Sequence, residues 1–243
     1  MEKSIQDLKK IARRQLGSNG LANTILTVTI VGVPIVSYLI FGTYSIIIIA
    51  VLLAPMLLGF GTYYLRLVRA YKAPYSRDPK TDYTIITPYY MKYSTSNPNV
   101  FNLSASTIFY GFKYFFTAAG MLLWYLIWIL LWSSLLVVPG IIKSYSYRLC
   151  FLILADNPEI GIRKSMKLSE KMMNGHRFKL FLLDISFIGW ILLSLITLLL
   201  GTAITIPYIM ATNAVFYEEL KKHCINSNTI EENEIVSKKH WDY

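Results

Sequence analysis

The chain has 243 residues, of which 54% are hydrophobic and 16% are charged, and its formal net charge is +10. Charged residues usually make up about a quarter of a globular chain. Their depletion here, and their absence from several long stretches, excludes a disordered chain, a disulfide scaffold and an ordinary cytosolic enzyme. An integral membrane protein remains. The two cysteines, Cys150 and Cys224, are too few for a disulfide framework, and the charged N-terminus lacks the apolar core of a signal peptide.

Apolar runs predict six transmembrane helices. A bilayer core of about 30 Å requires about 20 apolar residues in a helix. Two shorter runs each follow a full run after a minimal break, so they are interpreted as the return legs of hairpins. The predicted fold is all-α and polytopic, with six transmembrane helices arranged as three hairpins. The predicted spans are Leu21–Phe41, Tyr44–Leu65, Tyr114–Val138, Ile141–Ala155, Leu180–Leu200 and Thr202–Tyr217.

The distribution of basic residues predicts the orientation. Lys and Arg are retained on the cytoplasmic side of membrane proteins. Of the 24 basic residues, 22 lie before the first predicted span, after the last, or in the two loops on that same side. Both termini are therefore expected in the cytoplasm, and the protein in the plasma membrane of a bacterium. This topology explains the net charge, so nucleic-acid binding is not needed to account for it. The basic segments are expected to attract anionic lipid, with an interaction energy of about 1 kcal/mol per basic residue.

The N-terminal residues 1–20 are predicted to form an amphipathic interfacial helix. Ile5, Leu8, Ala12 and Leu16 fall in one stripe of a helix, as in helices that lie on a membrane surface. The alternative is a docking helix for the first span.

Three further segments lie outside the predicted spans of the transmembrane domain (residues 21–220). The cytoplasmic loop 70–112 is rich in proline and tyrosine, and is expected either to lie against the inner leaflet or to bind a partner. Residues 157–174 are predicted to form a cytoplasmic helix, with Asp156 or Asn157 as its cap and Asn174-Gly175 as its stop. Residues 221–243 are a cytoplasmic tail.

A weak internal repeat links the second helices of the three hairpins. Each has an early proline followed by aromatic residues: Pro55 then Tyr63-Tyr64, Pro139 then Tyr145 and Tyr147, and Pro207 then Phe216-Tyr217. Duplicated hairpins occur in transporters, but prolines near helix starts and interfacial tyrosines are also generic.

Polar residues inside the predicted spans are the candidate site. Helix geometry places Arg148, Asp184 and Asn213 at similar depths below the inner membrane surface. Unpaired charges cost about 2.5–3.5 kcal/mol at a helix centre, so an Arg148–Asp184 pair is expected. The layer is either a substrate or proton site or a structural ion pair that locks three helices. Lys143 is predicted to lie beside an external turn, as the one basic group that could face the outside.

Signatures of catalysis and of metal binding are missing. The sequence has no His-Glu-x-x-His motif, phosphate loop, Gly-x-Ser-x-Gly elbow or Cys-x-x-Cys pair. Its three histidines do not show metal-ligand spacing. We therefore expect no enzyme activity, no cofactor and no metal site.

Ordered motifs in the second half resemble a known family. The motifs are Val138–Tyr147, Ala155–Ile160, Met173–His176, Ser186–Trp190, Pro207-Tyr208 and Phe216-Tyr217. Together they resemble the bacterial integral-membrane family called domain of unknown function nine-seven-five, found mostly in Firmicutes. That family is distantly similar to the membrane domain of some glycerophosphodiester phosphodiesterases. The resemblance implies six helices in the plasma membrane and carries over no catalytic residue. The chain departs from the pattern in its longer Tyr71–Tyr110 loop and in Leu198–Ile204, which lacks the usual glycine-rich turn.

Two functions remain from the sequence. The first is a non-enzymatic multipass protein that acts in envelope stress, in self-protection (bacteriocin immunity) against membrane-active peptides, or as a transport accessory. Its partners would be the bilayer, anionic lipids and a membrane-active peptide or a transporter. The alternative is a small transporter or lipid-handling protein built around Arg148, Asp184 and Asn213.

Overall fold

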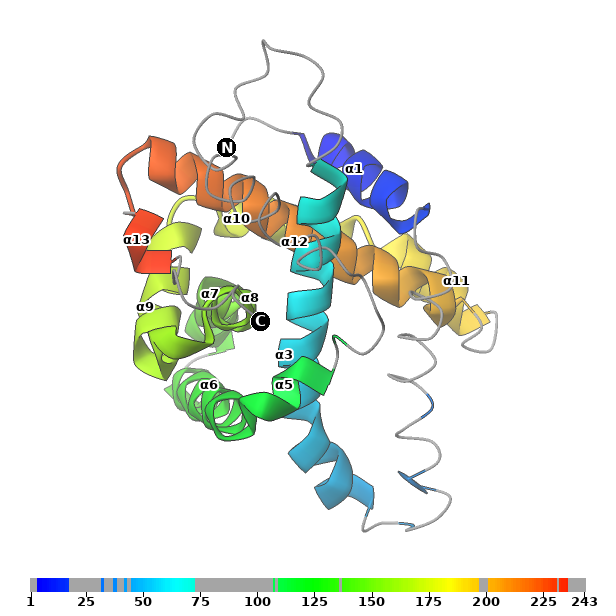
Figure 1. Cartoon of the computed structure of the whole chain (residues 1–243). Coiled ribbons are helices and arrows are strands. Elements are labelled where there is room, and N and C mark those ends of the chain that lie inside the picture. The colour runs from blue at the N-terminus through cyan, green and yellow to red at the C-terminus, as the bar shows by residue number, and fades with distance from the viewer. Residues whose placement is uncertain are drawn as a thin grey trace.

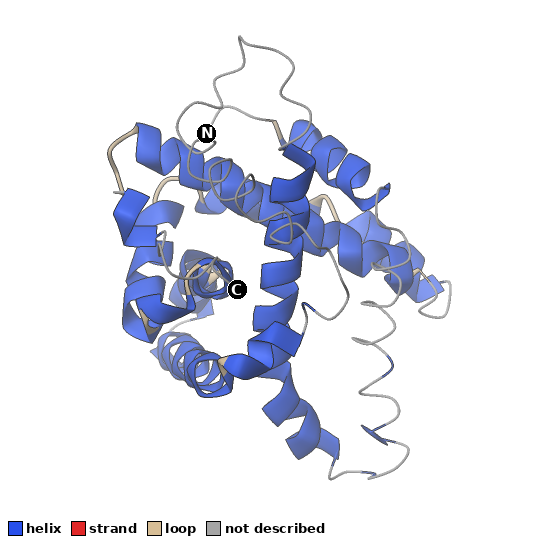
Figure 2. Ribbon diagram, viewed as in Figure 1, coloured by secondary structure: helices blue, strands red, loops and turns tan. Residues whose placement is uncertain are grey.

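The computed structural model describes residues 4–17, 45–72, 109–135, 137–196, 201–230 and 232–235, with the isolated positions 32, 37, 38, 42 and 107. Within these residues every regular element is a helix (Figure 2), which confirms the all-α prediction for this part of the chain. The predicted first span, Leu21–Phe41, and most of the Tyr71–Tyr110 loop lie outside the described residues.

The described helices differ widely in length, from the four residues of α5 to the 28 residues of α3. They are α1 (Ile5–Gly17), α3 (Ser45–Lys72), α5 (Tyr110–Lys113), α6 (Phe115–Leu135), α7 (Val137–Tyr147), α8 (Cys150–Asp156), the 3₁₀ turn η4 (Pro158–Ile160), α9 (Ile162–Met173), α10 (Arg177–Ile185), α11 (Ile188–Ile196), α12 (Thr202–Asn226) and α13 (Glu232–Ile235). Figure 1 shows α12 crossing α3, with α1 beside α12, while α6, α7 and α8 are seen close to end-on. The described helices therefore do not share one axis.

Two of the described helical stretches, Phe115–Ser134 and Val138–Asp156, are long and apolar enough to cross a membrane. The first is α6, which leaves most of its apolar surface uncovered by protein; Leu123 and Leu130 are 62% and 68% exposed. Large exposed apolar patches mark membrane or protein interaction surfaces. The composition and exposure of α6 thus indicate contact with a membrane.

The second stretch is broken between α7 and α8, where a serine from another helix satisfies the backbone. The Ser169 hydroxyl donates to the carbonyl oxygen of Ser146 (2.7 Å) and accepts from the backbone N–H of Leu149 (3.3 Å). Both backbone groups lie where the regular helix is interrupted, so each would otherwise be buried without a partner. These two hydrogen bonds fix the direction of α8 relative to α7.

A tight turn sends the chain back from α8 into α9. The Asn157 side chain accepts from the backbone N–H of Glu159 (3.2 Å), and Gly161 has a φ of +82°, which strongly favours glycine. The helix α9 then runs antiparallel to α8 and α7. Met166 and Met173 of α9 are buried against the rest of the protein. The predicted stop is confirmed, because α9 ends at Met173 and Gly175 has a φ of +78°.

The apolar stripe of α1 also faces protein. Leu8 and Ala12 are fully buried, and α1 packs on α12 and α3. The Lys9 ammonium donates to the carbonyl oxygen of Ser186 (2.9 Å), and the Arg13 guanidinium donates to the hydroxyl of Tyr208 (3.1 Å). Leu8 and Ala12 therefore face protein, and α1 docks on α12 and α3. The first span, on which the alternative expected α1 to dock, lies outside the described residues.

The C-terminal part of α12 meets the turn before α10 through two histidines. The rings of His176 and His223 lie 5.2 Å apart, edge to face. Burial lowers the pKa of His176 from its usual 6.5, and the charges of His223 and Lys179 lower it too. The folded protein therefore binds fewer protons than the unfolded chain below pH 6.5. Its stability is complete above this value and falls as the pH is lowered toward the pKa of the folded state.

This pH dependence can be measured on the midpoint of thermal unfolding in detergent solution. We expect wild type to lose more stability than His176→Asn between about pH 7.5 and about pH 5.5, because asparagine cannot take up the proton. His223→Asn serves as a second variant and should reduce the wild-type slope in part. An identical pH slope for wild type and His176→Asn would show that His176 titrates as in the unfolded chain.

Candidate functional site

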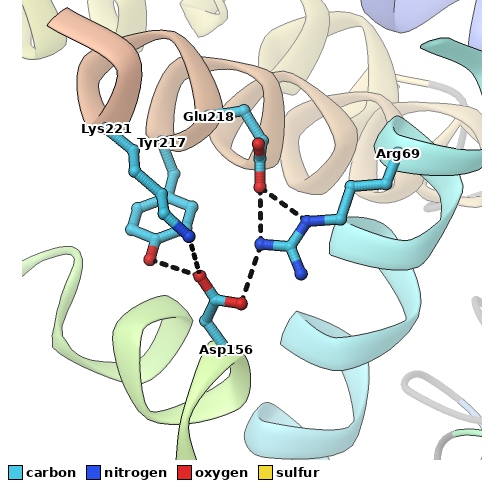
Figure 3. Close-up of polar contacts among 5 residues, drawn as sticks. All are labelled: Arg69, Asp156, Tyr217, Glu218 and Lys221. Atoms are coloured by element: carbon cyan, nitrogen blue, oxygen red, sulfur yellow. Dashed lines mark hydrogen bonds and ion pairs between the residues drawn. The ribbon is translucent and has the colours of Figure 1, made fainter. Parts of the chain in front are cut away.

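A buried cluster of charges joins α3, α8 and α12 (Figure 3). Asp156 ends α8, and its carboxylate binds the Arg69 guanidinium of α3 (2.8 Å) and the Lys221 ammonium of α12 (2.6 Å). The hydroxyl of Tyr217 donates to the same carboxylate (3.0 Å). Glu218 accepts from Arg69 on the other side, at 2.7 Å and 2.9 Å. We call these five residues the charge cluster.

The charge cluster is neutral overall, with two cations and two anions. All four charged residues are at most 7% exposed. Buried charges are tolerated when they are paired and hydrogen-bonded, whereas removing one partner leaves a buried charge uncompensated. The cluster therefore ties the ends of three helices to one another.

The sequence interpretation missed this cluster. Arg69 and Lys221 were counted among the cytoplasmic basic residues, and Lys221 was placed at the start of a cytoplasmic tail. In the structure α12 continues to Asn226, and Lys221 is fully buried within it. The cytoplasmic side of these residues stays a prediction. A signal was available: Arg69, Asp156 and Glu218 each follow the second apolar run of a predicted hairpin, so the repeat places them at the same level.

An apolar cavity of about 300 Å³ lies next to the charge cluster. Helices α3, α6, α8 and α12 line it, together with the break between α7 and α8. Its wall residues are Leu57, Phe60, Gly61, Tyr64, Leu122, Tyr125, Arg148, Leu149, Phe151, Leu152, Met210 and Asn213. On α8, Asp156 of the cluster comes four residues after the wall residue Leu152. On α12, Tyr217 comes four residues after the wall residue Asn213. Four residues correspond to about 6 Å along a helix. The cluster therefore lies about one helical turn beyond the cavity wall on α8 and on α12.

Two polar atoms in the cavity wall have unused hydrogen-bonding capacity. The side-chain oxygen of Asn213 and the hydroxyl of Tyr64 are both buried, and neither has a hydrogen-bond partner within the described part of the chain. Buried polar groups are nearly always hydrogen-bonded, so each exception requires an explanation. Surrounding protein atoms also shield both oxygens from the cavity.

The predicted polar layer is divided between the cavity and its edge. Arg148 and Asn213 both line the cavity, whereas Asp184 is not part of its wall. The Arg148 guanidinium lies 3.8 Å from the Asp184 carboxylate, and the Arg148 side chain is 45% exposed. Tyr145 donates to the same carboxylate at 3.2 Å. At this exposure an ion pair contributes at most about 1 kcal/mol, so Arg148 keeps most of its capacity to bind another anion.

The placement of Lys143 differs from the prediction. Its ammonium binds the carboxylate of Glu170 at 2.6 Å, and Glu170 belongs to α9. The sequence interpretation put Lys143 beside an external turn and α9 in the cytoplasm, but an ion pair requires both groups on the same side. The predictions of an external Lys143 and a cytoplasmic α9 therefore cannot both hold, and the sequence did not predict the pairing of Lys143 with Glu170. The physical reason is the turn at Gly161, which folds α9 back along α7.

Chemical crosslinking tests this contact. In a variant with Cys150 and Cys224 replaced by alanine, we expect Lys143→Cys and Glu170→Cys to be joined in high yield by a short thiol-reactive crosslinker. The matched control pairs Lys143→Cys with Glu159→Cys, which lies before the opposite end of α9 and should react poorly. Equal yields for the two pairs, read from intact masses, would contradict the antiparallel packing of α9 on α7.

The described residues contain no group of three or more His, Cys, Asp or Glu side chains that could hold a metal ion.

Residues 98–224 match the family described as "Protein of unknown function (DUF975)". The chain belongs to this family. The match covers α5 to α12 almost completely, and so includes the cavity walls from α6, α8 and α12 as well as Asp156, Tyr217, Glu218 and Lys221. No curated protein matches the chain. No solved structure matches it.

Proposed function

We propose that this protein is a non-enzymatic, multipass plasma-membrane protein that holds an amphipathic, lipid-like ligand in the cavity between α3, α6, α8 and α12. The observation that carries the proposal is the apolar cavity itself, of about 300 Å³, with the half-exposed side chain of Arg148 in its wall. Ligand pockets are mostly apolar, with a few convergent polar groups that orient the ligand. The cavity has this composition, with Arg148 as its charged member.

The proposed topology has six spans with both termini in the cytoplasm, as the charge distribution predicts. The apolar exposed surface of α6 supports membrane insertion. The exposed side of α9 sets a limit on this topology, because Arg163, Lys164 and Lys167 lie on it and charged groups avoid hydrocarbon. That side of α9 must therefore face water or lipid headgroups.

A cavity-filling substitution tests the proposed binding. Leu122 lines the cavity on α6, whereas its neighbour Leu123 is 62% exposed and lies outside the cavity wall. We expect native mass spectrometry of the protein released from membranes to show bound lipid in wild type and in Leu123→Trp, and to show its loss in Leu122→Trp. Retention of the same lipid by Leu122→Trp would place the binding elsewhere and contradict the proposal.

Asn213→Leu gives a second test, in which stability and ligand binding are expected to change in opposite directions. A buried polar group without a partner costs about 1–3 kcal/mol. We therefore expect Asn213→Leu to raise the free energy of unfolding of the ligand-free protein by about 1 kcal/mol while lowering ligand binding. Denaturant titration of delipidated protein measures the first effect. Asn226, exposed at the end of α12, is the matched control, and Asn226→Leu should leave the stability nearly unchanged. A stability loss in Asn213→Leu would show that the amide already has a partner.

The cellular role within this proposal is envelope stress response, self-protection against membrane-active peptides, or assistance to a transporter. Each role requires a membrane protein that binds without chemical conversion, and the cavity supports ligand binding in all three. Deletion of the gene followed by exposure to a panel of membrane-active peptides separates them. Unchanged sensitivity across the panel would exclude self-protection.

A further inference from the structure

We infer that one exposed face of α9 binds the headgroups of anionic phospholipid in the leaflet that it faces. This basic face consists of Arg163, Lys164, Lys167 and Lys171, all of which are exposed. The inference rests on the membrane insertion of the proposed function, but it needs no ligand in the cavity. It follows from three observations: the sorting of charged and apolar side chains on α9, the shortage of acidic partners, and the position of the basic face beside α6.

Opposite sides of α9 differ in chemistry. Met166 and Met172 are buried against the protein, whereas the basic face carries four cations. Arg163 and Lys167 are four residues apart, and so are Lys167 and Lys171, so these side chains are neighbours on the surface of the helix. Like charges at this spacing destabilise a helix. A bound anion would relieve this repulsion.

Few acidic groups balance the basic face. Glu170, the acidic residue within α9, is held in an ion pair with Lys143 of α7 at 2.6 Å. Glu234 of α13 lies 3.9 Å from Lys171, and both side chains are largely exposed. The other three cations of the basic face have no ion pair within the described residues. The face therefore keeps most of its positive charge available to a partner.

The basic face adjoins the apolar surface of α6. The Arg163 guanidinium lies over the ring of Trp124 at 5.3 Å, and the rings of Trp124 and Trp128 meet edge to face at 6.1 Å. Leu123 and Ile127, on the same part of α6, are 62% and 48% exposed. Tryptophan is enriched at the membrane–water interface. Cations, tryptophans and exposed aliphatic side chains are thus neighbours here, as they are where headgroups meet hydrocarbon.

This arrangement favours phospholipid over other anionic partners. An acidic protein or a nucleic acid would use the charges alone, whereas a bilayer also covers the exposed aliphatic side chains of α6. Anionic lipid attracts basic residues near its surface, and the attraction grows with each Lys or Arg. The planar guanidinium of Arg163 can bind a phosphate through two parallel N–H groups, whereas each lysine supplies a point charge. We therefore expect Arg163 to contribute most per residue.

Matched double variants separate a local site from overall charge. Lys164→Gln/Lys167→Gln removes two cations from the basic face, and Lys10→Gln/Arg14→Gln removes two exposed cations from α1. Both variants lower the net charge equally. The purified, delipidated, full-length protein in a neutral detergent is titrated with dioleoyl-phosphatidylglycerol, dioleoyl-phosphatidylcholine and glycerol phosphate. The headgroup preference is the ratio of the two lipid dissociation constants.

We expect wild type to bind phosphatidylglycerol about tenfold or more tightly than phosphatidylcholine, and glycerol phosphate not at all. Lys164→Gln/Lys167→Gln should reduce this preference by about tenfold or more, whereas Lys10→Gln/Arg14→Gln should keep it within about twofold. Arg163→Lys should lose less of it than Arg163→Gln, because lysine keeps the charge. The α9 double variant should unfold at a temperature no lower than wild type, since it removes like-charge repulsion.

The possible failures are distinguishable. Equal loss in the two double variants would show an effect of net charge, and an unchanged preference in Lys164→Gln/Lys167→Gln would place the binding elsewhere. Glycerol phosphate that binds as tightly as the lipid would make the ligand a soluble anion. Each of these results overturns the inference.

A comparison with the cavity variant separates this inference from the proposed function. Loss of the headgroup preference in Leu122→Trp but not in Lys164→Gln/Lys167→Gln would place the anionic lipid in the cavity, which overturns the inference and supports the proposed function. Loss in the α9 double variant alone supports the inference, whether or not Leu122→Trp loses a cavity ligand.

Discussion

Replacing Asp156 with alanine is expected to lower the free energy of unfolding by about 3–5 kcal/mol. The Asp156 carboxylate binds both Arg69 and Lys221 in the charge cluster, and its loss leaves the fully buried Lys221 without that partner. Denaturant titration in detergent micelles gives the free energy. Because three helix ends meet here, we expect the unfolding of α3, α8 and α12 to be affected together.

Two comparisons make this prediction specific. Glu170→Gln breaks the half-exposed ion pair with Lys143 and should cost less than about 1 kcal/mol. Lys221→Met added to Asp156→Asn restores the charge balance, so the double variant should be more stable than Asp156→Asn alone. A loss for Asp156→Ala no greater than that for Glu170→Gln would show that the cluster does not hold the three helices.

Gly111→Ala is expected to destabilise the protein by about 3 kcal/mol or more. A Cβ atom at Gly111 would overlap the carbonyl oxygen of Pro55 and lie 2.8 Å from its carbonyl carbon and 2.9 Å from the backbone nitrogen of Gly59. All three are backbone atoms of α3, which cannot move aside as a flexible side chain can. The substitution must therefore separate α5 from α3.

Gly189 in α11 is the matched control. A Cβ atom there would meet nothing within 4 Å, and the position is exposed. Alanine is favoured over glycine in a helix by about 1 kcal/mol, so Gly189→Ala should stabilise the protein slightly. The thermal unfolding midpoints of the two variants should thus move in opposite directions. A wild-type midpoint for Gly111→Ala would contradict the close approach of α5 to α3.

The sequence predicted the parts of the fold that depend on local pattern. Long apolar runs indicated α3 and α6, a shorter one indicated α12, and Asn174-Gly175 indicated the end of α9, because these signals lie in neighbouring residues. The break between α7 and α8 could not be predicted in this way. It depends on Ser169, which reaches the backbone from twenty residues along the chain.

Only part of the candidate site could be predicted, again because sequence patterns report on neighbouring residues. Helix geometry placed Arg148, Asp184 and Asn213 at one depth, but it could not show which of them face a common cavity. The charge cluster was missed because Arg69 and Lys221 are basic residues that flank apolar runs, a pattern typical of cytoplasmic loops. Their burial follows from the crossing of α3 and α12, and that crossing is a tertiary property. The ion pair of Lys143 was missed for a similar reason, since the turn at Gly161 brings its partner Glu170 back along α7.

Photolabelling gives the most direct test of the cavity as a ligand site. Lauroyl-lysophosphatidylglycerol with a diazirine in its acyl chain would be bound to the purified protein, activated by light and located by peptide mass spectrometry. A cavity site predicts labels on wall residues such as Leu122, Leu152 and Met210, and their loss in Leu122→Trp but not in Leu123→Trp. Labels confined to exposed apolar residues such as Leu123 and Leu130, and unchanged in Leu122→Trp, would contradict it.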